Sequence, residues 1–182
     1  MTFSIVAKCT KTGQLGMAVS SSSPAVAARC AHAKAGVGVV ASQNITDPRL
    51  GPKTLLAMAE GHRAPEAVKM IINAAENADF RQVLAVDATG NTAIYSGSKS
   101  LDIHADFASQ NAAAAGNLLA NPNIPKVMVT AFHQGTGHLG DRLIDAMRVA
   151  LALGGEAGEL HSAGLLLVAE QEWPMADLRC DW

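Results

Sequence analysis

The residue with the clearest chemical potential is Thr2, which follows the initiator methionine and opens the alternating segment TFSIVA. An initiator methionine is removed when the residue behind it is small, and threonine qualifies. The freed α-amine would have a pKa of about 7.7–8.0, close to working pH. Such an amine can take the proton of its own hydroxyl, so that the oxygen attacks an amide carbonyl and forms an acyl-enzyme. The alternative is that Thr2 is only the first residue of a strand.

Two further polar residues could assist this chemistry. Lys34 precedes an apolar strand, and a partly buried ammonium group would favour the neutral form of a neighbouring amine. An exposed lysine at a strand end explains Lys34 equally well. Ser20 opens the run SSSSP and could order Thr2 and a water molecule. A turn whose hydroxyls are hydrogen-bonded is the simpler explanation of that run.

Side-chain amides follow two apolar stretches, at SQN (42–44) and at GNLLAN (116–121). Asn117 could stabilise an oxyanion, because a side-chain amide donates hydrogen bonds to developing negative charge. The residues that could line a substrate pocket are Gln43, Asn44 and Ser162. The amides are explained equally well as turn residues.

Other types of site are weakly indicated. His133 and His138 flank a glycine turn with no acid nearby, which fits a helix end better than a metal site. Gly36 and Gly38 lack a third glycine and lie inside a strand, so they do not form a dinucleotide-binding loop. We therefore expect no metal and no organic cofactor.

Composition narrows the class of protein. The chain has 182 residues, 49% of them hydrophobic, which predicts one domain over residues 1–182. The net charge is −2 without a block of like charge, so neither nucleic acid nor an anionic membrane is an expected partner. The three cysteines form no CxxC pair. The sequence has no apolar run of about 18 residues and no secretory pattern, so we expect a cytoplasmic protein. We also expect the chain to continue past Trp182.

The spacing of apolar residues predicts an α+β fold. Strands are expected at 2–7, 15–20, 37–43 and 162–170, with a hairpin at 81–97. Helices are expected at 51–61, 64–76, 123–135 and 141–155. Strands and helices come in separate blocks, which favours antiparallel sheets over βαβ units. Two sheets packed together, with helix layers outside, would bury every apolar face.

Several short motifs, in their order along nearly the whole chain, resemble an uncharacterised family of Ntn-hydrolase-like proteins. They are TFSIVA, TGQLGMAVSSS, AKAGVGVVASQ, GP before a helix, QVLAVDATGNTAIYSG, GNLLA and SAGLLLV. The resemblance implies a four-layer αββα sandwich, as in proteasome subunits and other amidohydrolases with an N-terminal nucleophile. It places Thr2 at the nucleophile position and Lys34 at a position like the catalytic lysine of proteasomal β-subunits.

The sequence also departs from those relatives. The proteasomal aspartate after the second strand falls at Ser20, and His161 stands where family members carry glutamine. We therefore expect a hydrolase of a small amide or ureido compound, with Thr2 as nucleophile. The alternative is a catalytically silent protein of the same fold that binds a small molecule or serves in an assembly. Either could form a homodimer or a larger ring through its alanine-rich helices.

Overall fold

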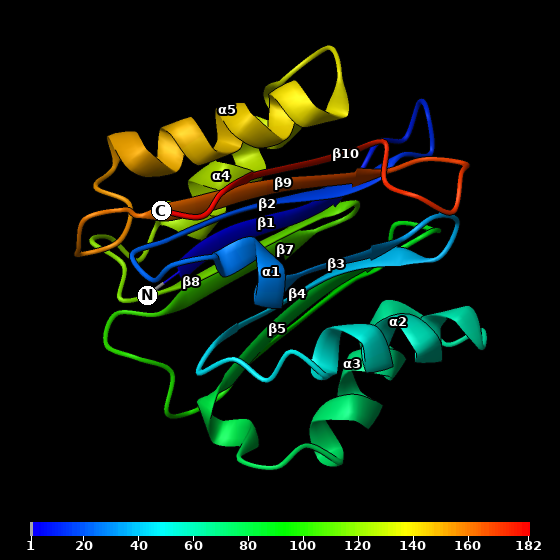
Figure 1. Cartoon of the computed structure of the whole chain (residues 1–182), viewed down its shortest axis with the longest axis horizontal. Helices are drawn as coiled ribbons and strands as arrows, with labels where there is room; N and C mark the ends of the chain where they lie inside the picture. The colour runs from blue at the N-terminus through cyan, green and yellow to red at the C-terminus, as the bar shows by residue number, and fades with distance from the viewer. Residues whose placement is uncertain (1) are drawn as a thin grey trace.

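Two antiparallel sheets form the centre of the protein in this computed structural model, which describes residues 2–182 (Figure 1). The six-stranded sheet has the order β10-β9-β2-β1-β8-β7. Its strands are β1 (Thr2–Lys8), β2 (Leu15–Ser21), β7 (Ala105–Ser109), β8 (Ala112–Asn117), β9 (Ser162–Val168) and β10 (Ala176–Cys180). The four-stranded sheet has the order β3-β4-β5-β6. Its strands are β3 (Ala31–Lys34), β4 (Gly38–Asn44), β5 (Arg81–Asp87) and β6 (Thr92–Ser96).

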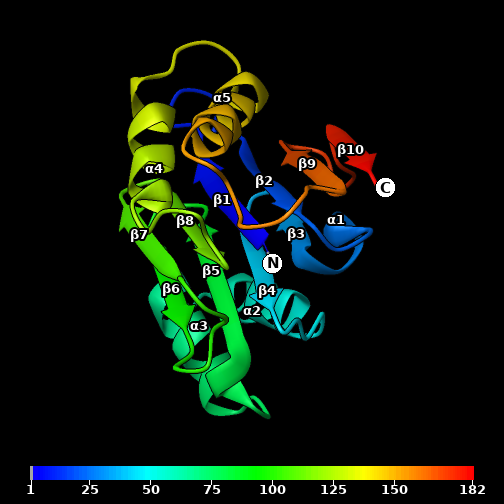
Figure 2. The same cartoon turned by 90° about the vertical axis from the view of Figure 1, so that its left-hand side faces the viewer.

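Helices cover the outer face of each sheet (Figures 1 and 2). The described residues form the α-helices α1 (Val26–Cys30), α2 (Leu50–Ala59), α3 (Ala64–Asn73), α4 (Ile124–Gln134) and α5 (Leu139–Ala152), and the 3-10 turn η1 (Ala78–Phe80). Helices α4 and α5 pack on the six-stranded sheet, whereas α2 and α3 pack on the four-stranded sheet. Short α1 packs beside β9, where a Cβ on Gly164 would come within 2.4 Å of the Cβ of Ala27. The inner faces of the two sheets pack against each other.

Alternation along β1 explains why both faces of the six-stranded sheet are buried. Phe3 and Ile5 point toward α4 and α5, whereas Val6 points toward the four-stranded sheet. Strand β8 contributes four consecutive alanines, each 0% exposed, so neighbouring layers can approach closely at this strand. A strand that is buried on both faces needs small or apolar side chains at every position.

The α+β class with antiparallel sheets is confirmed, and β1 and β2 form the predicted hairpin, with Phe3 opposite Ser20. The four predicted helices are present with ends shifted by a few residues. Strands β3, β7, β8 and β10 and helix α1 are additions that the apolar pattern did not predict. In residues 2–182, no helix combines the length and apolarity needed to cross a bilayer.

Asp87, which is 4% exposed, ties the end of β5 to two other segments. Its carboxylate accepts hydrogen bonds from the backbone N–H of Ala64, at the start of α3, and from Thr89 and Asn91 in the following turn. Burial alone would raise the pKa of Asp87, but these hydrogen bonds outweigh it and lower the pKa below its usual value. The ionised carboxylate therefore stabilises the fold.

Replacing Asp87 with asparagine is expected to lower the free energy of unfolding by about 2–3 kcal/mol at pH 7, because charge-assisted hydrogen bonds are lost. The folded-state pKa is depressed, so this stability is present above pH ~4 and disappears as pH falls through the folded value. Urea unfolding of both proteins from pH 7 to pH 3 measures the difference. The matched control is Asp79→Asn, whose exposed carboxylate only pairs with Lys99 at 3.5 Å. A constant difference across this pH range would contradict the assignment.

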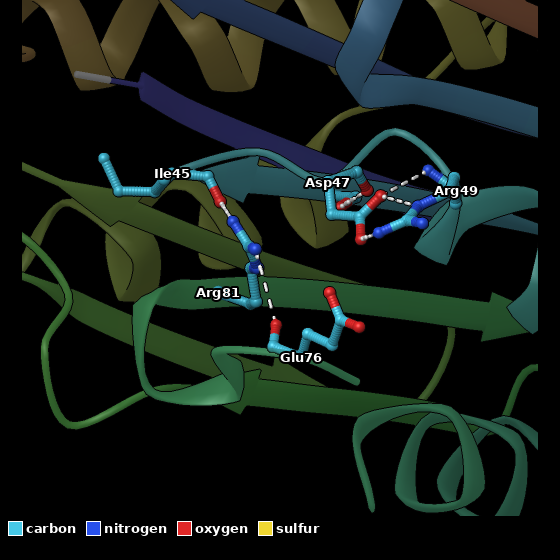
Figure 3. Close-up of polar contacts among 6 residues, drawn as sticks. Ile45, Asp47, Arg49, Glu76 and Arg81 are labelled. Atoms are coloured by element: carbon cyan, nitrogen blue, oxygen red, sulfur yellow. Dashed lines mark hydrogen bonds and ion pairs between the residues drawn. The ribbon is translucent and has the colours of Figure 1, made fainter. Parts of the chain in front are cut away.

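Two arginines, Arg49 and Arg81, hold the loop after β4 in place (Figure 3). The guanidinium of Arg49 donates two hydrogen bonds to the carboxylate of Asp47, at 2.9 and 2.8 Å, and holds the pKa of Asp47 at about 2. Arg81 donates to the backbone oxygens of Ile45 and Glu76. These contacts fix the chain between β4 and α2, directly after the residues of the candidate site.

Candidate functional site

Four polar side chains form one row across the inner face of the six-stranded sheet. Thr2 lies directly opposite Asn117 of β8, and Ser21 of β2 lies directly opposite Ser162 of β9. Thr2 and Ser21 are adjacent in turn, because the hydroxyl of Thr2 lies 3.2 Å from that of Ser21. Directly opposed residues in an antiparallel sheet share a face. We call this series, Asn117-Thr2-Ser21-Ser162, the upper row.

The four-stranded sheet presents a second polar row to the first. Gln82 of β5 lies opposite Gln43 of β4 on one side and Ser96 of β6 on the other. The Gln43 amide donates to Gln82 Oε1 at 2.7 Å, and the Gln82 amide donates to Ser96 Oγ at 3.0 Å. Both glutamines are 0% exposed. We call Gln43-Gln82-Ser96 the lower row.

Hydrogen bonds join the two rows across the sheet interface. Asn117 Nδ2 donates to Gln82 Oε1 at 3.2 Å, and Ser4 Oγ donates to Gln43 Oε1 at 2.5 Å. The two glutamine amides also donate to the backbone oxygens of Ala115 and Gly116 in β8, each at 3.2 Å. A buried polar network whose members are hydrogen-bonded holds its side chains in one arrangement. Asn117, next to Thr2, is therefore fixed in place.

The hydroxyl of Thr2 is buried and held in position. Thr2 is 4% exposed, and Ser21, whose hydroxyl it contacts, is 0% exposed. Ser21 in turn contacts the hydroxyl of Ser23 at 2.8 Å and accepts from the Ser23 backbone N–H at 3.1 Å. A chain of hydroxyls thus runs from the start of β1 into the loop after β2.

Buried oxygen atoms that have no hydrogen-bond partner among the described residues lie on either side of this series of hydroxyls. One is Asn117 Oδ1; the others are both carboxylate oxygens of Glu156, which is 4% exposed. Burial raises the pKa of Glu156, and the neighbouring Ser22 and His161 offset this only in part. Leu118, directly after Asn117, has a φ of 52°. Positive φ is rare for leucine, and backbone strain of this kind concentrates at functional sites.

The structure brings most of the predicted site residues together, but two catalytic assignments lie elsewhere. Lys34 is exposed and pairs with Gly38, five residues along β4 from Gln43 and therefore about 16 Å away. Ser20 points to the opposite face of β2, where its hydroxyl donates to the backbone oxygen of Ser162. Because side chains alternate between faces, Ser21 and not Ser20 contacts Thr2.

The predicted substrate-binding residues have defined structural partners. The Gln43 oxygen accepts from Ser4, and the Gln43 amide nitrogen donates to Gln82 and to the Ala115 backbone oxygen, so both ends of its amide are used. Asn44 points away from that row, donates to the Phe80 backbone oxygen and accepts from the Leu101 backbone N–H. Ser162 accepts from the Val26 backbone N–H and donates to the Ser23 backbone oxygen, so it anchors α1. All three side chains therefore hold the fold together around the site.

Ser21, Gln82 and Glu156 belong to the site but were not predicted from the sequence. Ser21 lies in a run of four serines, where residue type gives no information about which hydroxyl faces inward. Gln82 interrupts the inward-facing apolar series of β5, and this interruption was a detectable signal. Glu156 lies in the segment GGEAGEL, whose sequence resembles an ordinary loop.

An apolar cavity lies on the other face of β1. It has a volume of about 380 Å³ and is lined mainly by Phe3, Ala18, Ile144, Met147 and Leu178, with Ser20 at its wall. It is separated from the Thr2 hydroxyl by the sheet itself. Within residues 2–182, no three histidine, cysteine, aspartate or glutamate side chains gather as a metal site would require.

Comparison with known proteins places the chain in a family. The model of a family of unknown function, DUF1028, matches residues 2–182. The protein belongs to DUF1028. It is also similar to the crystal structure of protein SPO2555 from Silicibacter pomeroyi, described as a DUF1028 protein, with 30% identity and a TM-score of 0.89. That match covers 100% of this DUF1028 chain and 81% of the other. No curated protein matches this sequence.

Proposed function

We propose that this DUF1028 protein is a cytoplasmic amidohydrolase of the N-terminal nucleophile type, acting on a C–N bond of a small amide or ureido metabolite. The proposal includes the four-layer αββα sandwich of that class, which is compatible with two packed sheets covered by helix pairs. The observation that supports it most is the buried Thr2 hydroxyl, placed at the first residue of a central strand and 3.2 Å from Ser21.

The reaction would begin when removal of Met1 frees the α-amine of Thr2. The amine takes the proton of the Thr2 hydroxyl while Oγ1 bonds to the substrate carbonyl carbon, and the same proton then passes to the leaving nitrogen. Water hydrolyses the resulting ester and restores the threonine. Ser21 orients the hydroxyl in this scheme. Lys34 is not part of it, because Lys34 is exposed and pairs with Gly38, at the opposite end of β4 from Gln43.

Asn117 favours an amide or ureido substrate. A side-chain amide carries two N–H groups and one oxygen. One N–H of Asn117 is used on Gln82, which leaves the second for an oxyanion, and the buried Oδ1 has no partner among residues 2–182. The N–H of an amide or ureido group would satisfy that oxygen.

A panel of small amides and ureides tests this proposal. Protein with a free Thr2 amine is incubated with each compound, and the release of ammonia or amine is followed together with the intact mass. We expect release from at least one compound, with a transient mass increase equal to its acyl group. Absence of release and of acylation across the panel, with the Thr2 amine confirmed free, would count against the proposal.

The apolar cavity supports the alternative, a catalytically silent protein that binds a small apolar metabolite. Its lining is nearly all hydrocarbon, and it lies away from Thr2. Binding of an apolar ligand that Met147→Trp abolishes, in protein that shows no acylation of Thr2, would favour this alternative.

We further propose that two copies of the chain associate through β10, an edge strand whose outer side has no paired strand among the described residues. Asp177 and Arg179 pair with each other within β10, at 2.8 Å. If two copies pair antiparallel about Leu178, Asp177 of each also lies opposite Arg179 of the other. Opposed opposite charges stabilise such pairs, and a two-fold interface must be self-complementary in this way. Leu178 itself is 60% exposed.

Light scattering at several protein concentrations checks this interface. We expect a dimer that Asp177→Arg converts to a monomer, because the introduced guanidinium of each copy would then face Arg179 of the other. The double exchange of Asp177→Arg with Arg179→Asp restores opposite charges and should restore the dimer. A wild-type monomer at every concentration, or a dimer unaffected by the single exchange, would rule the interface out.

A further inference from the structure

Glu156 lies at the end of the molecule where β1 begins. It forms a β-bridge with Leu119, two residues beyond Asn117, which is the partner of Thr2 in the sheet. The preceding residue, Gly155, packs on Phe3, since a Cβ there would lie 3.5 Å from the Phe3 ring. Glu156 therefore lies between two segments that adjoin Thr2: the one that follows Asn117 and the one that packs on Phe3.

The loop after β2 covers Glu156 from another side. Ser22, whose neighbour Ser21 contacts the Thr2 hydroxyl, is near enough to lower the pKa of Glu156, although neither carboxylate oxygen meets a partner at normal hydrogen-bond geometry among residues 2–182. His161 is tied to the same loop, because its backbone N–H donates to the Ser21 oxygen. The carboxylate is therefore enclosed by segments that meet at Thr2.

A buried carboxylate without a partner is costly. Its transfer from water is strongly unfavourable unless charge or hydrogen bonds compensate, and an unsatisfied buried group in a folded protein calls for an explanation. Glu156 is 4% exposed; the hydroxyl and backbone N–H of Ser22 lower its pKa, but among residues 2–182 no donor meets either carboxylate oxygen at normal hydrogen-bond geometry, so its charge is compensated only in part. A carboxylate accepts hydrogen bonds and attracts positive charge, so the group that fits it is a small cation with N–H donors.

His161 is a titratable side chain whose charge also acts on Glu156 and lowers the pKa of its carboxyl. Its ring stacks on Trp182 at 4.2 Å between ring centroids, which directs it to the C-terminal segment. No hydrogen bond joins the His161 ring to the carboxylate among the described contacts. The imidazole therefore does not account for a buried carboxylate at this place.

We propose that Glu156 is a positioning residue that holds the freed α-amine of Thr2 and stabilises the ammonium group formed when that amine takes the hydroxyl proton. This inference rests on the proposed function, because it requires the amine to be free. The proton moves from Oγ1 to the α-nitrogen, the Oγ1–carbon bond forms, and the proton later leaves with the substrate nitrogen. In this role the ionised form of Glu156 pairs with the ammonium group, and its carboxylate touches only that amine.

The α-amine pKa of processed protein tests the proposal without any substrate. It is measured from the pH dependence of acetylation by trace isotopic acetic anhydride, read from the N-terminal peptide by mass spectrometry. An opposite charge in contact favours the protonated amine, so Glu156→Gln should lower this pKa by about 1 unit or more. Glu156→Asp should give an intermediate value.

The matched controls are Glu159→Gln, an exposed glutamate in the same loop, and His161→Gln. Both should leave the amine pKa within a few tenths of wild type. Circular dichroism verifies folding, and Glu156→Gln preserves side-chain size. An unchanged amine pKa in folded Glu156→Gln would overturn the proposal, and so would an N-terminal peptide that still begins with methionine.

These outcomes separate the proposal from the proposed function. If the amine pKa does not respond to Glu156 but turnover still requires Thr2, the nucleophile stands and the role of Glu156 falls. If the amine pKa responds but no substrate is cleaved, Glu156 holds the amine and the amidohydrolase assignment fails.

Discussion

Thr2→Ala is expected to lower kcat/KM by about 10⁴-fold or more on any amide or ureide that the protein cleaves. Removing a covalent nucleophile leaves only the contribution of binding and of oxyanion donors. The fold should survive, because the substitution removes a single buried hydroxyl, and a hydrogen bond is worth about 1 kcal/mol. Steady-state kinetics and a thermal melt on the same samples measure both effects.

Two variants control this experiment. Thr2→Ser keeps a hydroxyl on the same amine and should retain measurable turnover, while Thr10→Ala removes an exposed hydroxyl from the turn after β1 and should change nothing. Near-wild-type turnover by Thr2→Ala would show that another group performs the chemistry, and the nucleophile assignment would be abandoned.

The second large effect concerns the lower row. Gln82→Leu should reduce the free energy of unfolding by about 3 kcal/mol, because it leaves Asn117 Nδ2 without its partner and removes donors from Ser96 and the Gly116 oxygen. For a chain of this length the melting temperature should fall by about 6–12 °C. Urea unfolding monitored by circular dichroism provides the measurement.

Gln171→Leu serves as the control, since Gln171 is exposed in the loop between β9 and β10. We expect it to alter stability by less than about 0.5 kcal/mol. If Gln82→Leu were equally mild, the two rows would not be a cooperative network, and Asn117 would not be rigidly placed beside Thr2.

The pattern of apolar residues, whether alternating or continuous, predicted the strands whose side chains are buried on one or both faces. β1, β2, β4 and β9 carry strong patterns, and each is present. β8 reads AAAAGN and has no strand preference of its own; its state comes from pairing with β1 and β7. The five-residue edge strands β7 and β10 are largely exposed, so no buried stripe identified them.

The candidate site was predictable in part, for a similar reason. Thr2 and Asn117 could be named from type and position, and the sheet register then placed them opposite each other. The choice between Ser20 and Ser21 required the phase of β2, which a run of serines does not reveal. Lys34 is exposed because β3 is an edge strand, and the burial of Glu156 depends on how the loop after α5 folds against β1 and β2.

The proposed mechanism requires Thr2 to present a free amine and a nucleophilic hydroxyl. The most direct measurement is the intact mass of the protein purified from its native host, with the N-terminal peptide sequenced. We expect a mass short by one methionine and a peptide beginning TFSIVA. A peptide beginning MTFSIVA would leave Thr2 without its base, contradict the proposed mechanism and favour a binding protein.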